Sequence, residues 1–292
     1  MADLHVWAST LLVLVGVIAF DFFLAARRPR EVGMREASLW VVFYILSAVV
    51  FAVGLYCIES PKSSGEFVAG WLTEYSLSID NLFVFLIIFS RLKVPKKSIQ
   101  SVLMIGIALA LVFRGLFITL GAVLIHRFIW MFFIFGTFLI VTAVRLIYQG
   151  GGDEDWQEGR VVSYFKRQRV GTFGVAVVAI GTTDLLFAFD SIPAIFGITQ
   201  DPYIVFTANA FALMGLRQLY VLLGRLVEQL VHLSKGLAVI LAFIGIKLIG
   251  EALDGVGVDV PQISVGVTLA VIVLTLAITT VVSLNSDRKL KN

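Results

Sequence analysis

The sequence predicts an all-α integral membrane protein with nine transmembrane helices, because of its composition, its apolar runs and the placement of its charges. Apolar residues make up 59% of the 292 residues and charged residues 15%, with a mean hydropathy of +0.96. A soluble domain has about 25% charged residues. Runs near the roughly 20 residues that cross a bilayer recur along the chain. We expect spans at 6–26, 37–58, 67–90, 99–125, 128–148, 171–197, 203–224, 237–253 and 262–284.

These spans are expected to be helices, because open strands would leave backbone groups unpaired in lipid. No run shows the alternation of an outer-membrane barrel. The single cysteine, Cys57, excludes an internal disulfide, and with only three histidines the chain has no Cys/His cluster for zinc or copper. A bound metal ion would therefore have oxygen ligands.

The basic residues predict the orientation, because Lys and Arg concentrate in cytoplasmic loops. Alternate connections and the C-terminal tail hold 17 of the 23 basic residues, and the opposite face holds only Lys62 and Arg127. We expect the N-terminus outside, the C-terminus inside and the first span retained as an anchor, since the motif RRPR follows it. The basic pI reflects this topology, so no nucleic-acid partner is expected.

The longest polar connection, QGGGDEDWQEGRVVSYFKRQRV, divides the chain into two comparable halves. We expect two N-terminal helices in 1–66, a first repeat in 67–148, a cytoplasmic connection at 149–170, a second repeat in 171–253, and a C-terminal helix and cytoplasmic tail in 254–292.

Three motifs recur in the same order in both halves and predict an internal repeat. The matching motifs include Glu74 and Asp184, Arg114 and Arg217, and Arg145 and Lys247. The matching residues are 110, 103 and 102 positions apart, so spans three to five correspond to spans six to eight. Because each copy has three spans, the second copy would cross the membrane inverted. Inverted repeats are typical of transporters that bind their substrate near the bilayer midplane.

Charged residues inside the apolar spans are the candidate functional groups. They are Asp21, Glu74, Asp80, Asp184, Asp190, Arg114, Arg145 and Lys247, with Arg217 and Glu251 nearer a membrane face. A charge at a helix centre costs at least about 2.5 kcal/mol and often marks an ion or proton pathway. The alternative is that acids and bases form buried ion pairs that only fix helix packing.

The spacing of the paired acids leaves two geometries open. Six residues of helix advance about 9 Å and turn about 240°, so two acids at this spacing point apart. Asn81 lies seven residues after Glu74 and Ser191 seven after Asp184, so each acid shares a face with a second oxygen donor. Either the helices are interrupted, as Pro193 would favour, or each repeat supplies ligands at two depths. Such all-oxygen donors suit Mg²⁺, Ca²⁺ or Mn²⁺.

Two further polar residues are ambiguous. Asp21 lies beside RRPR, where it would form a local salt bridge or bind a metal ion on the cytoplasmic access route. Asn209 would form a packing hydrogen bond or act as a ligand. The GGG at 150–152 lacks the Lys-Ser/Thr of a phosphate loop, and we find no nucleophile triad or catalytic metal motif. We therefore expect neither enzymatic activity nor a cofactor.

Two motifs, EYSLSIDNLFVF at 74–85 and TTDLLFAFDSIPAIFGITQDPYIVFTANAFALMGLRQLY at 182–220, are similar to those of the TerC family. This family is named for tellurite resistance and includes the Alx manganese exporters. The resemblance implies a LysE-type fold of inverted three-helix repeats. It also implies export of Mn²⁺ across the inner (plasma) membrane.

On this resemblance, the metal ligands would be Glu74, Asp80, Asp184 and Asp190, supported by Asn81 and Ser191. We expect Asp80 and Asp190 to meet near the midplane. Mn²⁺ would be transported substrate, and the expected partners are the divalent ion and membrane lipid. Protons are the candidate coupling ion, because desolvated carboxylates bind protons more readily. The rival hypothesis is a non-transporting membrane factor that assists assembly or metal loading of other membrane or exported proteins.

Overall fold

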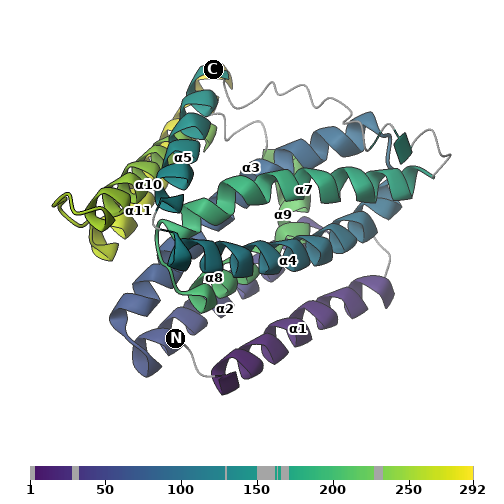
Figure 1. The fold of residues 1–292 in the computed structure, drawn as a ribbon. Helices are drawn as coiled ribbons and strands as arrows, with labels where there is room; N and C mark the ends of the chain where they lie inside the picture. Colours follow the sequence, from purple (N-terminus) through teal and green to yellow (C-terminus); the bar gives the residue numbers. More distant parts are fainter. Residues whose placement is uncertain are drawn as a thin grey trace.

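The computed structural model describes residues 4–27, 33–128, 130–149, 162, 164–165, 171–226 and 233–291. Every regular element in these ranges is a helix, which confirms the all-α prediction (Figure 1). The helices are α1 (Leu4–Arg27), α2 (Met34–Ile58), α3 (Pro61–Arg91), α4 (Lys96–Arg127), α5 (Met131–Gln149), α7 (Thr172–Phe196), α8 (Pro202–Leu213), α9 (Leu216–Leu226), α10 (Leu233–Gly255) and α11 (Val265–Lys291).

Eight spans within the described residues are long and apolar enough to cross a membrane. They correspond to the predicted spans two to nine. The predicted first span lies in α1, whose apolar part, His5–Phe20, is shorter than the other eight. Most of the predicted cytoplasmic connection at 149–170 lies outside the described residues.

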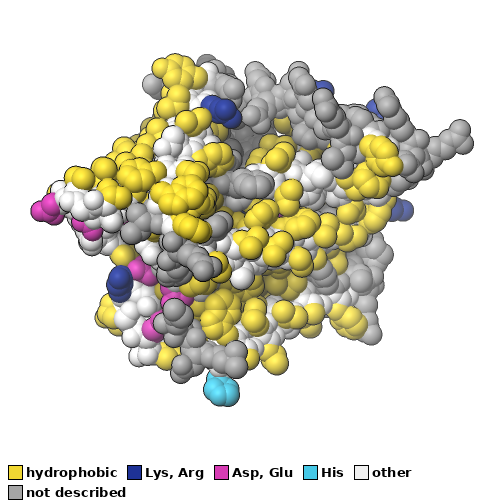
Figure 2. Space-filling view, in the orientation of Figure 1, with side chains coloured by type: hydrophobic (Ala, Val, Ile, Leu, Met, Phe, Trp, Pro, Cys, Tyr) yellow, Lys and Arg dark blue, Asp and Glu magenta, His cyan; other side chains and the backbone are white. Residues whose placement is uncertain are grey.

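The outer surface of the bundle is strongly apolar. On α2, Leu39, Val42, Leu46 and Val50 recur at helical spacing and are each more than half exposed. Figure 2 shows hydrophobic side chains covering much of the visible surface. Large contiguous apolar surfaces are rare on soluble monomers. This surface matches the hydrocarbon core of a bilayer.

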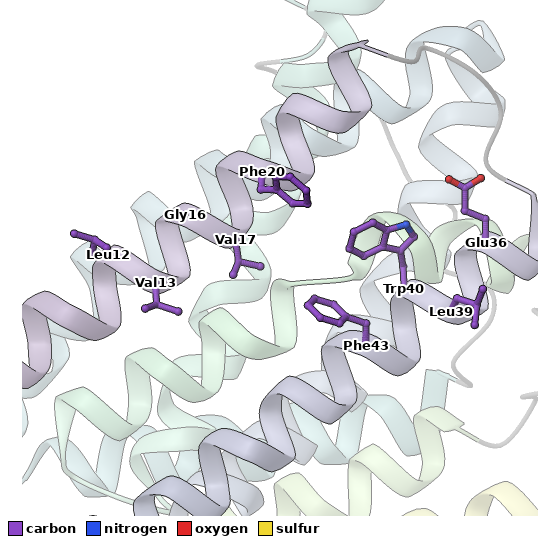
Figure 3. Close-up of a pocket in the computed structure, with 9 residues that line it drawn as sticks. All are labelled: Leu12, Val13, Gly16, Val17, Phe20, Glu36, Leu39, Trp40 and Phe43. Carbon is purple, nitrogen blue, oxygen red and sulfur yellow. The ribbon is translucent and has the colours of Figure 1, made fainter.

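An apolar groove of about 680 Å³ lies between α1 and α2. Val13 and Val17 of α1 face Trp40 and Phe43 of α2 across it (Figure 3). Glu36 is the one charged residue among those that line it. The lining therefore suits hydrocarbon better than a polar ligand.

The predicted seventh span is broken into α8 and α9, so the expectation of one helix over 203–224 is wrong. Met214 is extended, with ψ 127°, and Gly215 has φ +90°. That φ favours glycine, because a Cβ clashes in the left-handed region. A Cβ at Gly215 would also lie 2.9 Å from a ring carbon of Tyr44. The break therefore depends on glycine at this position.

The helices that carry the paired acids are not interrupted. Both α3 and α7 run as single helices, and Pro193 lies inside α7. The interrupted-helix geometry predicted as one alternative is therefore wrong for these two spans. Any ligands that α3 or α7 supplies six residues apart would lie at two depths.

The helices of the two halves pack closely on one another. The α5 helix packs along α10, α4 packs on α7, and α3 packs on α8. A Cβ on Gly136 would lie 2.7 Å from the carbonyl oxygen of Gly245, and a Cβ on Gly245 would lie 2.8 Å from that of Gly136. Glycine at both positions thus permits the close contact of α5 with α10.

Candidate ion site: a buried charged centre

Three charged residues lie near the middle of long helices. Glu74 of α3, Arg114 of α4 and Asp184 of α7 are each at least 12 residues from both ends of their helices. Twelve helical residues span about 18 Å, so these positions fall near the centre of a membrane-sized helix. Only 0%, 1% and 5% of the respective residue surfaces are exposed.

The Arg114 guanidinium joins these helices, and we call Glu74, Arg114, Asp184 and Asn209 the charged centre. Arg114 Nη1 forms an ion pair with Glu74 Oε1, and Arg114 Nη2 lies 3.7 Å from Asp184 Oδ1. Arg114 Nη1 also donates a hydrogen bond of 2.6 Å to Asn209 Oδ1 on α8. The Ser78 hydroxyl donates a weaker bond to Glu74 Oε1, at 3.4 Å. The charged centre therefore connects both halves of the chain.

The charges of this centre do not balance among the described residues. Two carboxylates face one guanidinium, and a buried net charge is costly unless it is compensated. Several buried polar atoms also find no hydrogen-bond partner among the described residues: Glu74 Oε2, Asp184 Oδ2, and Nε and Nη2 of Arg114. Buried polar atoms are usually satisfied. The centre can accept a further cation, proton or water molecule.

The structure brings three of the eight predicted ligands together. Glu74, Asp184 and Asn209 meet at Arg114. Ser191 is buried, with a hydroxyl that has no hydrogen-bond partner among the described residues, and Asn81 is partly buried. The side chains of Asp21, Asp80 and Asp190 lie outside the described residues. The expected meeting of Asp80 with Asp190 therefore stays a prediction.

Among the described residues, no three His, Cys, Asp or Glu side chains are grouped so that they could hold a metal ion. Arg114 itself contacts Glu74 and Asp184, which are two of the acids that the sequence proposes as ligands. The sequence singled out Arg114 as a repeated intramembrane cation but not as a member of the site. The repeat relation between Arg114 and Arg217 was the signal in the sequence that Arg114 has a role. Residue spacing alone did not predict that Arg114 contacts acids of both halves.

A polar hollow of about 1600 Å³ opens at one end of the bundle, lined by α3, the α7–α8 connection, α10 and the segment before α11. Figure 2 shows acidic side chains gathered at the left of the view, on the same side as α10 and α11 in Figure 1. Thr199 donates a 2.6 Å hydrogen bond to Glu66 in this hollow. Lys247 bonds the Gly197 carbonyl at 2.5 Å and pairs with Glu251 at 3.3 Å.

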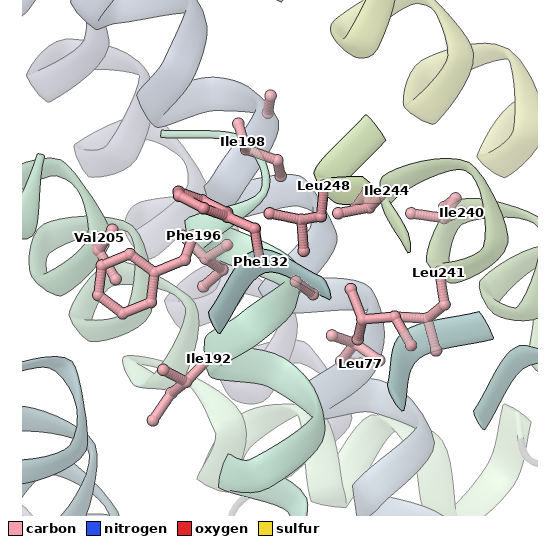
Figure 4. Close-up of a cluster of buried hydrophobic side chains, with 14 of the residues drawn as sticks. Leu77, Phe132, Ile192, Phe196, Ile198, Val205, Ile240, Leu241, Ile244 and Leu248 are labelled. Atoms are coloured by element: carbon pink, nitrogen blue, oxygen red, sulfur yellow. The ribbon is translucent and has the colours of Figure 1, made fainter. Parts of the chain in front are cut away.

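Part of the lining of this hollow is apolar. Phe132, Phe196 and Ile198 line the hollow and also belong to a buried hydrophobic cluster (Figure 4). Glu66 lines the hollow, and Glu74 lies eight residues further along α3, or about 12 Å deeper. The Glu74 carboxylate of the charged centre thus lies deeper along α3 than the α3 residues that line the hollow.

The fold and the buried charges define a multi-pass integral membrane protein with a polar centre inside its bundle. The chain belongs to the TerC family: the family model described as "Integral membrane protein TerC family" matches residues 59–291. This match confirms the resemblance that the two sequence motifs indicated.

Relatives align over most of the chain. It is 39% identical over 316 residues to an uncharacterized membrane protein of Mycobacterium tuberculosis (strain CDC 1551 / Oshkosh), covering 97% of this chain and 80% of the relative. It is 32% identical over 313 residues to "Putative membrane-bound redox modulator Alx" of Escherichia coli (strain K12), covering 97% of this chain and 96% of the relative. No solved structure matches the chain.

Proposed function

We propose that this protein is a secondary transporter that exports a divalent cation, with Mn²⁺ as the principal substrate. The observation that carries the proposal is the convergence of Glu74 and Asp184, from the two halves of the chain, in a charged centre whose charges do not balance among the described residues. A protein that only packs its helices gains little from an uncompensated buried charge. Two carboxylates match the charge of a divalent ion, and oxygen donors suit Mn²⁺.

The broken helix supports a transport role. The α8 helix carries Asn209 of the charged centre and ends four residues later, at Leu213. The last carbonyls of a helix have no intrahelical partner. Transporters commonly use such helix ends near the midplane to bind ions.

The transport cycle would rest on an inverted repeat of spans three to five and six to eight within a nine-span topology. The contact of α5 with α10 supports this arrangement, because both helices bury a small-Leu-small pattern at the same spacing. The two sets are Gly136, Leu139 and Ala143 on α5, and Ala238, Leu241 and Gly245 on α10. They are related by the same 102-residue offset as Arg145 and Lys247.

The orientation would place the N-terminus outside and the C-terminus in the cytoplasm, in the plasma membrane. The hollow would then face outward, because Lys62 at its rim lies in the predicted second connection. Single cysteines introduced at the two termini, in a Cys57→Ser background, would be labelled from opposite sides. Labelling of both termini from the same side would refute the nine-span topology.

Proteoliposomes test the transport proposal. We expect the reconstituted protein to move Mn²⁺ and the variants Glu74→Gln and Asp184→Asn to lose more than about tenfold of the rate, because each removes a carboxylate from the centre. Asp254→Asn, which lies in the hollow, is the matched control and should retain transport. Absence of metal movement by the folded wild-type protein would favour the rival role in assembly or metal loading.

A relative's name links the family to redox modulation, and the same experiment addresses that possibility. Cys57 is the only cysteine of the chain and is exposed. A single cysteine cannot form an internal dithiol couple. Metal transport by Cys57→Ser at the wild-type rate is expected, because α2 does not contribute to the charged centre.

A further inference from the structure

We propose that Arg114 competes with the transported cation for the carboxylates of Glu74 and Asp184. Arg114 must leave these two acids before a metal ion can bind, and this exchange selects divalent over monovalent ions. The inference rests on the proposed transport function. It assigns a specificity-determining role to a residue of the centre that is not itself a metal ligand.

The Arg114 guanidinium occupies the place where a metal ion would bind. Arg114 contacts Glu74 on α3, Asp184 on α7 and Asn209 on α8, and only 1% of its surface is exposed. A metal ion bound by both carboxylates would occupy the space between them, which Arg114 now fills. Since an arginine keeps its proton in proteins, the site cannot be vacated by deprotonation. The guanidinium has to be displaced as a charged group.

The geometry of the pairing indicates that displacement is possible. An arginine that clamps a carboxylate permanently tends to do so with two parallel bonds. Arg114 instead uses Nη1 for both Glu74 and Asn209, whereas its Nε and Nη2 have no hydrogen-bond partner among the described residues. One oxygen of Glu74 and one of Asp184 are equally unpartnered. Arg114 and the two acids therefore each keep unused hydrogen-bonding atoms, which would be available if Arg114 moved away and a metal ion took its place.

Charge arithmetic gives the selectivity. With Arg114 in place, the two carboxylates retain a net charge of −1 among the described residues. A divalent ion that replaces the guanidinium neutralises both acids. A monovalent ion that replaces it only exchanges one positive charge for another and leaves the −1 unchanged. Counted on the two acids and the cation that they bind, the exchange therefore favours a divalent over a monovalent ion.

The test measures Mn²⁺ binding to the full-length protein in detergent, from the free-Mn²⁺ electron paramagnetic resonance signal, with and without excess Na⁺. We expect R114Q to bind Mn²⁺ at least about tenfold more tightly than wild type, because a positive charge a few ångströms from the ion is removed. Na⁺ should compete with Mn²⁺ in R114Q and not in wild type. R35Q, which removes an exposed arginine from the first turn of α2, should match wild type.

R114K keeps the proposal testable even if R114Q does not fold. Lysine retains the charge but grips a carboxylate as a point charge, so we expect Mn²⁺ affinity a few-fold above wild type. Thermal unfolding with and without Mn²⁺ identifies folded samples. Binding by wild type with unchanged or weaker binding by folded R114Q or R114K would overturn this inference alone. No Mn²⁺ binding by wild type or either variant would overturn the transport proposal with it.

Discussion

The charged centre and the polar hollow both contain acids and bases, but they treat these charges differently. In the hollow, Lys247 pairs with Glu251 from one helical turn away; Lys247 is buried, but the Glu251 side chain keeps 30% of its surface exposed. One oxygen of Glu251 has no hydrogen-bond partner among the described residues. In the centre, Glu74 and Asp184 share Arg114 with hardly any exposure and with polar atoms left over. The pair in the hollow is local to one helix and partly exposed at Glu251, whereas the charges of the centre are shared between the two halves and buried.

The two regions therefore differ in the energetic cost of their charged groups. A pair that keeps part of its surface exposed costs less to form, and contributes less when formed, than a fully buried one. A desolvated, unbalanced group is expensive, and it persists where it has a function. The comparison therefore predicts that equivalent substitutions have large effects in the centre and small effects in the hollow.

Removing the central cation should produce the largest change in stability. Arg114→Met leaves two buried carboxylates without a counter-charge, so we expect a loss of about 3–5 kcal/mol in metal-free buffer. Lys247→Met in the hollow leaves Glu251 accessible to water and should cost about 1–2 kcal/mol. Reversible unfolding in mixed micelles measures both values. Equal losses would show that the two regions are not energetically distinct.

The acids that the structure leaves undescribed offer the next test. Asp80→Asn and Asp190→Asn should each lower Mn²⁺ export more than about tenfold at normal abundance, because each removes a proposed ligand while keeping the side-chain shape. Asp153→Asn, in the predicted cytoplasmic connection, is the control. Normal export by either variant would restrict the site to the charged centre, and loss of protein alone would support an ion pair that fixes packing.

Sequence reasoning predicted the helices because hydrocarbon imposes a uniform length and polarity on every span. It also identified Glu74 and Asp184, since a carboxylate in an apolar run is expensive wherever it points. It counted Arg114 among the candidate functional groups but could not say which acids it meets, because those contacts depend on helix packing. It missed the break at Gly215, since neighbouring leucines and valines continue the apolar pattern. It left open an interruption near Pro193, where the structure shows α7 running through the proline as a single helix.

The break between α8 and α9 should respond more modestly. Gly215→Ala forces a Cβ into a left-handed backbone and within 2.9 Å of the Tyr44 ring. We expect a loss of about 1–2 kcal/mol from the backbone strain, and a lower transport rate if the break moves during the cycle. Gly54→Ala in α2, where an added Cβ meets nothing within 4 Å, is the matched control. A fully stable Gly215→Ala would mean that the break tolerates other backbone conformations.

The smallest effect is expected in the hollow itself. Glu251→Gln removes one partner of the Lys247 pair, but Lys247 keeps its bond to the Gly197 carbonyl and both groups lie at a polar opening. A partly exposed pair of this kind contributes at most about 1 kcal/mol, so stability should change by less than that. The apparent Mn²⁺ affinity should weaken by no more than about twofold, and the difference should fade as salt is raised, because mobile ions screen exposed charges. Transport assays at low and high ionic strength measure this. A loss that persists at high salt would instead make Glu251 a ligand and would extend the ion site from the charged centre to the hollow.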